Sequence, residues 1–180
     1  MLLAETATRV GAQLGGRAGL LSAALLVRDP GNGDEPEPSG VGVAATRRAG
    51  GHYVISWIGD AHALSWDGER LIRRTTPHTL AEQLRVHGFV VDPATADWIT
   101  TALPQATPAT VLSVECDDSL VLLCSDGIDC IPANELEGIV RDFAHEPQAL
   151  ADSIVAAASE DAEGYRDDVT VVVIRAPEEG

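Results

Sequence analysis

Apolar residues in the first part of the chain recur at three- and four-residue spacings, which is the pattern of one buried helix face. The positions that follow it are Ala7, Val10, Leu14, Leu21, Ala24 and Leu25. Two adjacent glycines, Gly15 and Gly16, interrupt the pattern, because glycine is a poor helix former. We therefore expect two short helices between Ala4 and Val27.

Residues 29–40 read DPGNGDEPEPSG and carry no hydrophobic periodicity. Proline lacks a backbone N–H and glycine favours turns, so neither a helix nor a central strand can run through such a segment. The sequence predicts an acidic surface loop here.

After this loop the hydrophobic pattern changes to alternation, which is typical of β-strands with one buried face. Alternating residues at 41–45 and 53–57 predict one hairpin. A second hairpin is expected from 63–66 and 70–73, since the Asp67-Gly68 pair between them suits a tight turn.

The middle of the chain favours helices. Thr79 is a suitable N-cap for a helix with one apolar face that ends near Gly88. A further helix is expected over Pro93–Leu103.

Strands and helices alternate in the last third of the chain. The expected strands are Val111–Val114, Leu120–Cys124 and Val169–Ile174, and the expected helices are Ala133–Phe143 and Gln148–Ala158. This order predicts an α/β (α+β) fold, a β-sheet with helices on its faces. A chain of 180 residues suits a single domain.

Charge narrows the choice of partners. The chain has 12 basic and 28 acidic residues, a net charge of -16, so a polyphosphate would be repelled and nucleic acid is not an expected partner. The longest apolar stretch, Ala18–Val27, is half the roughly 20 residues that span a bilayer. Glu5 and the lack of a basic start argue against a signal peptide. We expect a cytoplasmic protein that does not contact membranes.

Three cysteines, Cys116, Cys124 and Cys130, form neither a CxxC pair nor a cluster with histidine. We expect them to be reduced and structural rather than zinc ligands, in a reducing compartment.

Aspartates lie where predicted strands meet turns. Asp126 and Gly127 follow the strand that ends at Cys124, and Asp167 precedes the last strand. If these strands are antiparallel neighbours, the two carboxylates converge, as suits Mg²⁺ or Mn²⁺. Asp60, which follows Gly59 after another strand, is a third candidate ligand.

The same residues also fit an ordinary structural interpretation. Asp-Gly pairs are common in turns, and acids at the start of a strand can simply be solvated. The five histidines are scattered, and their spacing supports no Ser-His-Asp arrangement. The segment GAQLGGRAG matches neither a dinucleotide-binding nor a P-loop pattern.

Three motifs in this order resemble the type 2C metal-dependent protein Ser/Thr phosphatases, the PPM family. LVLLCSDGIDCI resembles the family's "LLLCSDG" segment, and RDDVTVVVIR resembles "DNxTVVVV". WIGDAHALSWDGERLIRRTTPHTLAEQLRVHG is similar to "VGDSRAYLxRxGxLxxLTxDHSLVxxLVxxG". The resemblance covers roughly residues 40–175 and implies a β-sandwich of two antiparallel sheets flanked by helices.

The resemblance also implies site residues and chemistry. Asp126 and Asp167 would be ligands of a binuclear Mg²⁺ or Mn²⁺ centre, and Asp60 with Asp126 would hold a third, weaker metal. Gly59 and Gly127 would support the turns. The reaction implied is hydrolysis of phosphoserine or phosphothreonine in a phosphoprotein by a metal-activated water.

The chain departs from the family pattern at several positions. "GDSR" is Gly59-Asp60-Ala61-His62 here, and "DN" is Asp167-Asp168. The family's "NED" and "DGMGGH" segments, which supply the phosphate-binding arginine and the other bridging aspartate, do not occur in the 180 residues. Relative to the family pattern, the chain begins about one β-hairpin late, so we expect the first strands of the sandwich to be missing.

Three hypotheses follow. A protein that starts further upstream would be a working phosphatase. A protein complete as given would be a pseudophosphatase that binds a phosphoprotein or kinase-pathway partner, and a homodimer could cover its open sheet edge. The third is an unrelated acidic binding module. Abundant Ala, Arg and Gly also point to a GC-rich bacterial genome.

Overall fold

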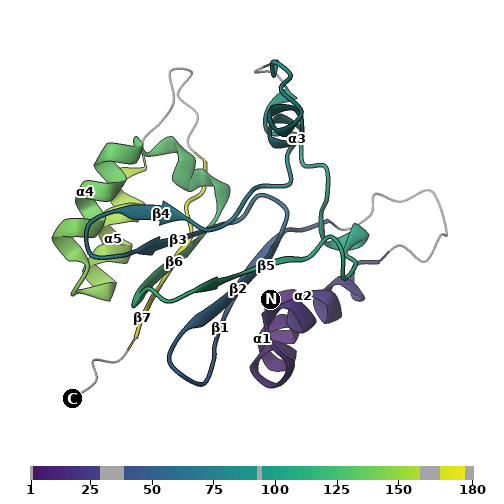
Figure 1. Ribbon diagram of the computed structural model, residues 1–180, viewed down its shortest axis with the longest axis horizontal. Helices are drawn as coiled ribbons and strands as arrows, with labels where there is room; N and C mark the ends of the chain where they lie inside the picture. The colour runs from purple at the N-terminus through teal and green to yellow at the C-terminus, as the bar shows by residue number, and fades with distance from the viewer. Residues whose placement is uncertain (1, 29–38, 93–94, 159–166, 177–180) are drawn as a thin grey trace.

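The computed structural model describes residues 2–28, 39–92, 95–158 and 167–176. Two antiparallel sheets face each other, with helices on both outer sides (Figure 1). Sheet A has the strand order β1-β2-β5, and sheet B has the order β4-β3-β6-β7. The predicted β-sandwich flanked by helices is confirmed.

The first two helices cover sheet A. Helix α1 spans Leu2–Leu14 and α2 spans Gly16–Ala24. The chain breaks between them at Gly15, whose φ of 95° is a left-handed conformation that glycine adopts without strain. The two predicted helices and their separation at the glycine pair are confirmed.

Sheet A brings together strands that are distant in the sequence. Strand β1 (Gly42–Arg47) pairs with β2 (Tyr53–Ile58), which also pairs with β5 (Leu112–Cys116). Alternate residues of β2 point to different layers: Ile55 lies in the apolar layer between the sheets, whereas Ile58 packs in the layer beneath α2. Strand β2 is buried on both faces, rather than on the one face that a simple hairpin predicts.

Sheet B contains the second predicted hairpin, β3 (His62–Trp66) and β4 (Leu71–Arg73). Strand β6 (Leu120–Cys124) lies between β3 and β7 (Val171–Arg175) and is antiparallel to both.

Helices α4 (Ala133–Phe143) and α5 (Pro147–Ala157) cover the outer face of sheet B. Leu136, Val140, Leu150 and Ile154 from these helices pack against Leu122 of β6 in one apolar cluster.

The middle of the chain partly departs from the prediction. Helix α3 (Leu80–Val86) is capped by Thr79, whose hydroxyl accepts the N–H of Glu82, as expected. It has no buried residue, however, and projects from the sandwich (Figure 1), so its apolar face is not part of the core.

The predicted helix over Pro93–Leu103 is wrong. Of this range, Pro93 and Ala94 lie outside the described residues, residues 95–102 form turns, irregular chain and a β-bridge from Ile99 to Thr79, and Leu103–Gln105 makes a short 3-10 helix. The carbonyl oxygens of Trp98 and Ala96 accept the N–H groups of Leu80 and Ala81. These carbonyls satisfy the free donors at the start of α3 and are not used in a helix of their own.

Several other expectations have mixed outcomes. Cys116 and Cys124 are buried as expected, whereas Cys130 is exposed. Most of the predicted acidic loop at 29–40 lies outside the described residues. Within the described parts of the chain, no helix has the length and apolar character needed to cross a bilayer.

Candidate functional site

Three chain segments that carry the candidate aspartates meet at one end of sheet B. In the β3–β6 pairing, His62 lies opposite Cys124, so the chain just before β3, which carries Asp60, lies beside the chain just after β6, which carries Asp126. In the β6–β7 pairing, Cys124 lies opposite Val171, which brings the turn after β6 beside the residues that precede β7. Strands β6 and β7 are antiparallel neighbours, as expected, whereas a site shared by the carboxylates of Asp126 and Asp167 stays a prediction.

The turn that carries Asp60 is held by a glycine and a histidine. Gly59 has a φ of 88°, and a Cβ at this position would lie 2.1 Å from Cγ1 of Val41. Its N–H donates to Nδ1 of His78 at 3.0 Å, and its carbonyl accepts the backbone N–H of His78 at 2.9 Å. Burial lowers the pKa of His78, which keeps the ring neutral and Nδ1 available as an acceptor.

The segments of Asp126 and Asp167 are joined directly. The hydroxyl of Ser125 donates to the carbonyl oxygen of Asp168 at 3.0 Å and accepts the N–H of Thr170 at 3.0 Å. A Cβ at Gly127 would lie 2.7 Å from that same carbonyl oxygen. Only glycine allows this turn to approach the backbone of Asp168 so closely. Ser125 and Thr170 were not singled out in the sequence, because their role depends on strand pairing.

The electrostatics of Asp60 differ from those of an ordinary surface carboxylate. Its side chain is buried, and burial together with the negative charge of Asp126 raises its pKa. Asp97, in the segment after α3, also raises it. No arginine pairs with Asp60 among the described residues, and attraction to His62 offsets only part of the increase in its pKa.

The other two aspartates are more accessible. Asp126 is exposed, and its Oδ1 accepts the N–H of Gly127 at 3.1 Å. Asp167 is half-buried, and its Oδ1 accepts the N–H of Asp168 at 2.9 Å. In each of these two carboxylates, Oδ1 accepts a hydrogen bond, whereas Oδ2 accepts none from the described residues.

No complete metal centre is present in the described part of the chain. Groups of three or more His, Cys, Asp or Glu side chains close enough to hold one metal ion do not occur there. The site residues fit a cation held by a pair of carboxylates, with water in the remaining positions, as Mg²⁺ accepts.

A second polar cluster lies next to these aspartates, and the sequence did not reveal it. Nε2 of the buried His62 lies 2.9 Å from Oδ2 of Asp129, and Arg73 donates to the other carboxylate oxygen. Burial opposes ionisation of Asp129, but His62 and Arg73 outweigh it and lower the pKa of this carboxyl. Because the cluster joins β3, β4 and the turn after β6, it holds that turn against sheet B.

Cys124 lies beside this cluster but is not reactive. Burial raises the pKa of its thiol to about 12, so the thiolate form is absent at neutral pH. This agrees with the expected structural role of this cysteine.

We compared the sequence and the fold of this chain with those of known proteins. No family model matches the sequence, and no curated protein matches it. Solved structures do match the fold. The PPM Ser-Thr phosphatase MsPP from Mycobacterium smegmatis is 23% identical with a TM-score of 0.71, over 97% of this chain and 80% of that one.

Two further solved structures are similar. PppA, a regulatory component of the type VI secretion system of Pseudomonas aeruginosa, is 22% identical with a TM-score of 0.77, over 97% of this chain and 77% of that one. The serine/threonine phosphatase PstP of Mycobacterium tuberculosis is 25% identical with a TM-score of 0.68, over 96% of this chain and 73% of that one. A PstP catalytic domain has also been solved with 2 manganese ions.

Three observations agree with one another. The three sequence motifs resemble the same family as these structural neighbours, and the chain has two antiparallel sheets with flanking helices. This chain has the fold of the PPM-type Ser/Thr phosphatases.

Proposed function

We propose that this chain is a phosphatase-like protein that acts on phosphoserine or phosphothreonine of a protein partner with the help of Mg²⁺ or Mn²⁺. The observation that carries the proposal is the closeness of Asp60, just before β3, to Asp126, just after β6, whose charge raises the pKa of Asp60; Asp167 lies on the neighbouring segment before β7. The phosphatase-like fold supports the same proposal.

The residues present fit a divalent cation. Two carboxylates that repel each other, one of them buried, are stabilised when a cation lies between them. Carboxylate oxygens are the hard ligands that Mg²⁺ and Mn²⁺ prefer. We propose Asp60 and Asp126 as its ligands, with Asp167 approaching from the β7 side. A bound cation would acidify a water and neutralise phosphoryl oxygens.

The remaining site residues position these carboxylates. His78 and Gly59 hold the turn of Asp60, while Ser125 and Gly127 keep the Asp126 turn against the start of β7. These contacts would orient the ligands before a cation binds, so that little reordering is needed on binding.

One observation favours a second candidate function, a pseudophosphatase that binds a phosphoprotein without hydrolysing it. Hydrolysis with two metal ions requires several ligands at one place, and among the described residues no three His, Cys, Asp or Glu side chains come together to hold a metal ion. Such a protein, located in the cytoplasm, would regulate a kinase pathway by holding the phosphorylated partner.

Metal binding and hydrolysis can be measured separately. Calorimetric titration of the purified chain with Mn²⁺ tests the cation site, and phosphate release from a phosphothreonine peptide tests turnover. We expect binding that Asp126→Asn weakens by at least about tenfold. The matched control is Asp117→Asn, at an exposed aspartate of the β5–β6 connection.

Each outcome decides between the candidates. Mn²⁺-dependent phosphate release that Asp126→Asn removes supports the phosphatase. Mn²⁺ or phosphopeptide binding without release supports the pseudophosphatase. If Asp126→Asn and Asp167→Asn leave Mn²⁺ binding unchanged, the proposed site is wrong and an unrelated binding module becomes the better interpretation.

A further inference from the structure

Helix α3 and the chain that returns from it stand away from the sandwich (Figure 1). We call residues 79–99 the α3 projection, of which 93–94 lie outside the described part of the chain. Among its described residues only Thr79 is buried, whereas Val90 is 96% and Trp98 is 61% exposed. Since apolar burial contributes little to its position, hydrogen bonds at its base hold it to the rest of the fold.

Both ends of the projection meet at His78. The carbonyl oxygen of His78 accepts the backbone N–H of Thr100 at 2.8 Å and the hydroxyl of Thr100 at 2.9 Å. Thr79, the next residue, forms a β-bridge with Ile99. The outgoing and the returning chain are thus joined at His78 and its neighbour.

His78 also reaches the turn that carries Asp60. Its Nδ1 accepts the N–H of Gly59 at 3.0 Å, and its own backbone N–H donates to the carbonyl oxygen of Gly59 at 2.9 Å. Asp60 follows Gly59 directly in the chain. Hydrogen bonds therefore run from the base of the projection through His78 to the residue beside a proposed cation ligand.

The projection and the cation site also interact through charge. Asp97, on the returning chain, repels the carboxylate of Asp60, as Asp126 does. In the metal-free chain this repulsion opposes the approach of the returning chain to the site, and a cation held by Asp60 and Asp126 offsets it. Charge and hydrogen bonding thus act in the same direction, because a state that stabilises the Asp60 turn also favours the ordered projection.

We propose that His78 is a positioning residue that couples the α3 projection to the cation site. With the Gly59 N–H held by Nδ1, the Asp60 turn and the projection form one cooperative unit, so a cation at Asp60 orders the projection. By thermodynamic linkage, a ligand that orders the projection raises the affinity of the site for the cation by the same factor. This coupling rests on the cation site of the proposed function, whereas the junction at His78 can be measured without metal.

A separate contact keeps the outgoing chain attached when the His78 side chain is removed. Nε1 of Trp57, in β2, donates to the carbonyl oxygen of Thr76 at 2.8 Å. Substitution of His78 therefore loosens the junction without detaching the projection from the sandwich, and amides of β6 provide the internal reference for a folded core.

The first test measures hydrogen exchange of the full chain in the presence of a metal chelator. His78→Ala removes the acceptor, and His78→Asn retains one, because Oδ1 of Asn and Nδ1 of His are both attached to Cγ. His87→Ala, at an exposed histidine at the end of α3, is the matched control. We expect His78→Ala to speed exchange of the Gly59, Leu80 and Thr100 amides by about tenfold or more, and the other two variants to change it by less than about threefold.

The second test adds Mn²⁺. At saturating concentrations, Mn²⁺ should slow exchange of the Leu80 and Thr100 amides of the wild type by about fivefold, although neither residue is a proposed ligand. His78→Ala should lose this protection and bind Mn²⁺ about tenfold more weakly, whereas His78→Asn should bind it within about threefold of the wild type. A role of His78 confined to the projection would leave the affinity for Mn²⁺ unchanged.

Several results would overturn the coupling. In the metal-free chain, it is wrong if His78→Ala leaves exchange of the Gly59, Leu80 and Thr100 amides as in the wild type. With Mn²⁺, it is wrong if saturation leaves the Leu80 and Thr100 amides unprotected, or if His78→Ala and the wild type bind Mn²⁺ equally. A wild type that binds no Mn²⁺, but whose junction amides respond to His78→Ala and recover in His78→Asn, would refute the cation site and the coupling together while the junction stands.

Discussion

At Gly127 the turn after β6 passes the backbone of Asp168 so closely that a Cβ would lie 2.7 Å from its carbonyl oxygen. At Gly138, in the middle of α4, a Cβ would meet nothing within 4 Å. The two glycines therefore have opposite tolerance for alanine, although both look like ordinary glycines in the sequence.

We expect Gly127→Ala to destabilise the protein by roughly 1–3 kcal/mol, because backbone must shift to admit the methyl group. It should also weaken Mn²⁺ binding, since the shift moves Asp126. Gly138→Ala should stabilise by roughly 0.5–1 kcal/mol, as alanine does within a helix. Urea unfolding measures both, and equal stability of Gly127→Ala and wild type would contradict the close approach.

Asp60 gives a pH dependence whose sign follows from its raised pKa. The folded state disfavours the ionised carboxylate, because it is buried and faces Asp126. Ionisation of Asp60 therefore lowers the free energy of unfolding. This effect is absent at a pH well below the ordinary pKa of 3.8, and it grows as the pH rises through and above that value. In the presence of a metal chelator, the Asp60→Asn variant should therefore be more stable than the wild type at neutral pH, and no more stable than the wild type at acidic pH.

Addition of Mn²⁺ should reverse this order. A cation that binds only the folded state raises stability, by about 2.7 kcal/mol at one hundred times its dissociation constant. The wild type should gain this increment and Asp60→Asn only a small part of it. Thermal unfolding at several pH values, with and without Mn²⁺, measures both effects, and a wild type insensitive to Mn²⁺ would argue against the cation site.

At the scale of elements, the connection between β5 and β6 carries the chain from sheet A to sheet B, and a partly buried polar network holds it. Asp118 Oδ2 accepts the hydroxyl of Ser65 at 2.5 Å and a guanidinium N–H of Arg74 at 2.6 Å. Nε of Arg74 also donates to the Ser65 hydroxyl at 2.7 Å. The network ties the connection to β3 and to the chain that follows β4.

We expect Asp118→Ala to destabilise by roughly 1–3 kcal/mol, since it leaves the fully buried Ser65 hydroxyl and the Arg74 guanidinium without their shared acceptor. Asp117→Ala, at the exposed neighbouring residue, should change stability by less than about 0.5 kcal/mol. Chemical denaturation compares the two variants. Similar values for both would mean that the network contributes little.

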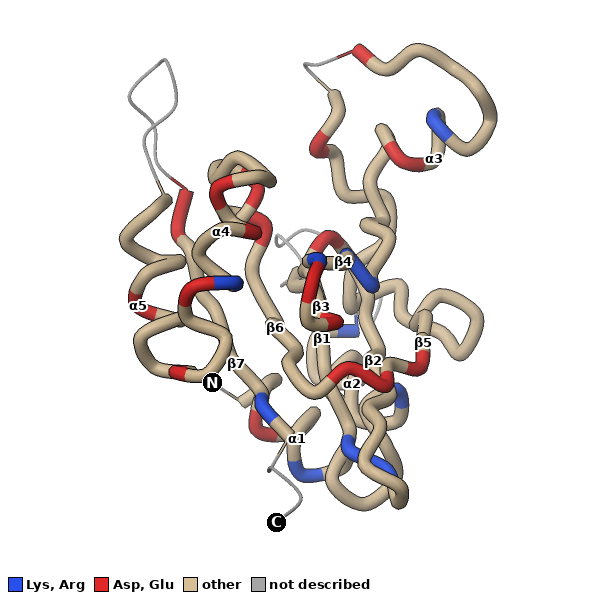
Figure 2. Tube along the Cα trace, turned by 60° about the vertical axis from the view of Figure 1, so that its left-hand side comes forward, with Lys and Arg blue, Asp and Glu red and all other residues tan. Residues whose placement is uncertain are grey.

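At the scale of the whole molecule, acidic side chains are spread over most of the surface. Figure 2 marks the backbone positions of acidic residues around α4, near α3 and at the β5–β6 connection, and those of basic residues near the turn between β1 and β2. A net charge of -16 produces repulsion in the compact state, and dissolved salt screens it.

Raising NaCl to about 0.5 M should therefore raise the melting temperature, because the Debye length falls well below the size of the molecule. Asp142→Lys, at an exposed position of α4, reduces the net charge by two and should show a smaller increase. Differential scanning calorimetry at several salt concentrations checks this. A melting temperature that falls with salt would mean that attractive ion pairs dominate.

Most secondary structure could be predicted from the sequence, because local periodicity reports which face of an element is buried. The two N-terminal helices, both hairpins and the strands β6 and β7 follow this pattern. The segment 95–102 does not, since its carbonyl groups cap α3 and that use depends on how the chain folds back.

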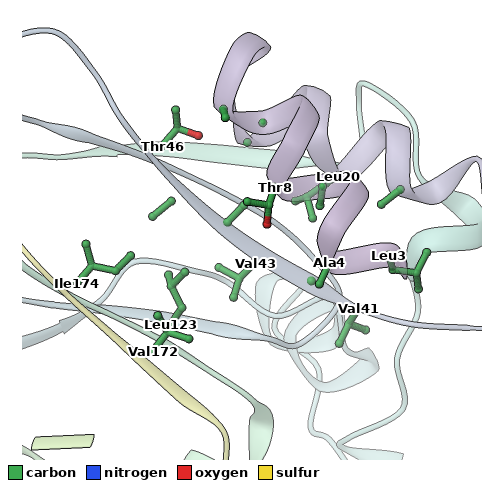
Figure 3. Close-up of a pocket in the computed structure, with 18 of the residues that line it drawn as sticks. Leu3, Ala4, Thr8, Leu20, Val41, Val43, Thr46, Leu123, Val172 and Ile174 are labelled. Carbon is green, nitrogen blue, oxygen red and sulfur yellow. The ribbon is translucent and has the colours of Figure 1, made fainter. Parts of the chain in front are cut away.

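The sequence by itself also determined which residues could form a site: Asp60, Asp126 and Asp167 each lie where a strand meets a turn. Only the tertiary structure decided that Asp60 and Asp126 lie close enough to repel each other, that His78 holds the turn of Asp60, and that an apolar cavity lies beside β1 (Figure 3). Strand order and register join residues far apart in the chain, and no local pattern encodes which strands become neighbours.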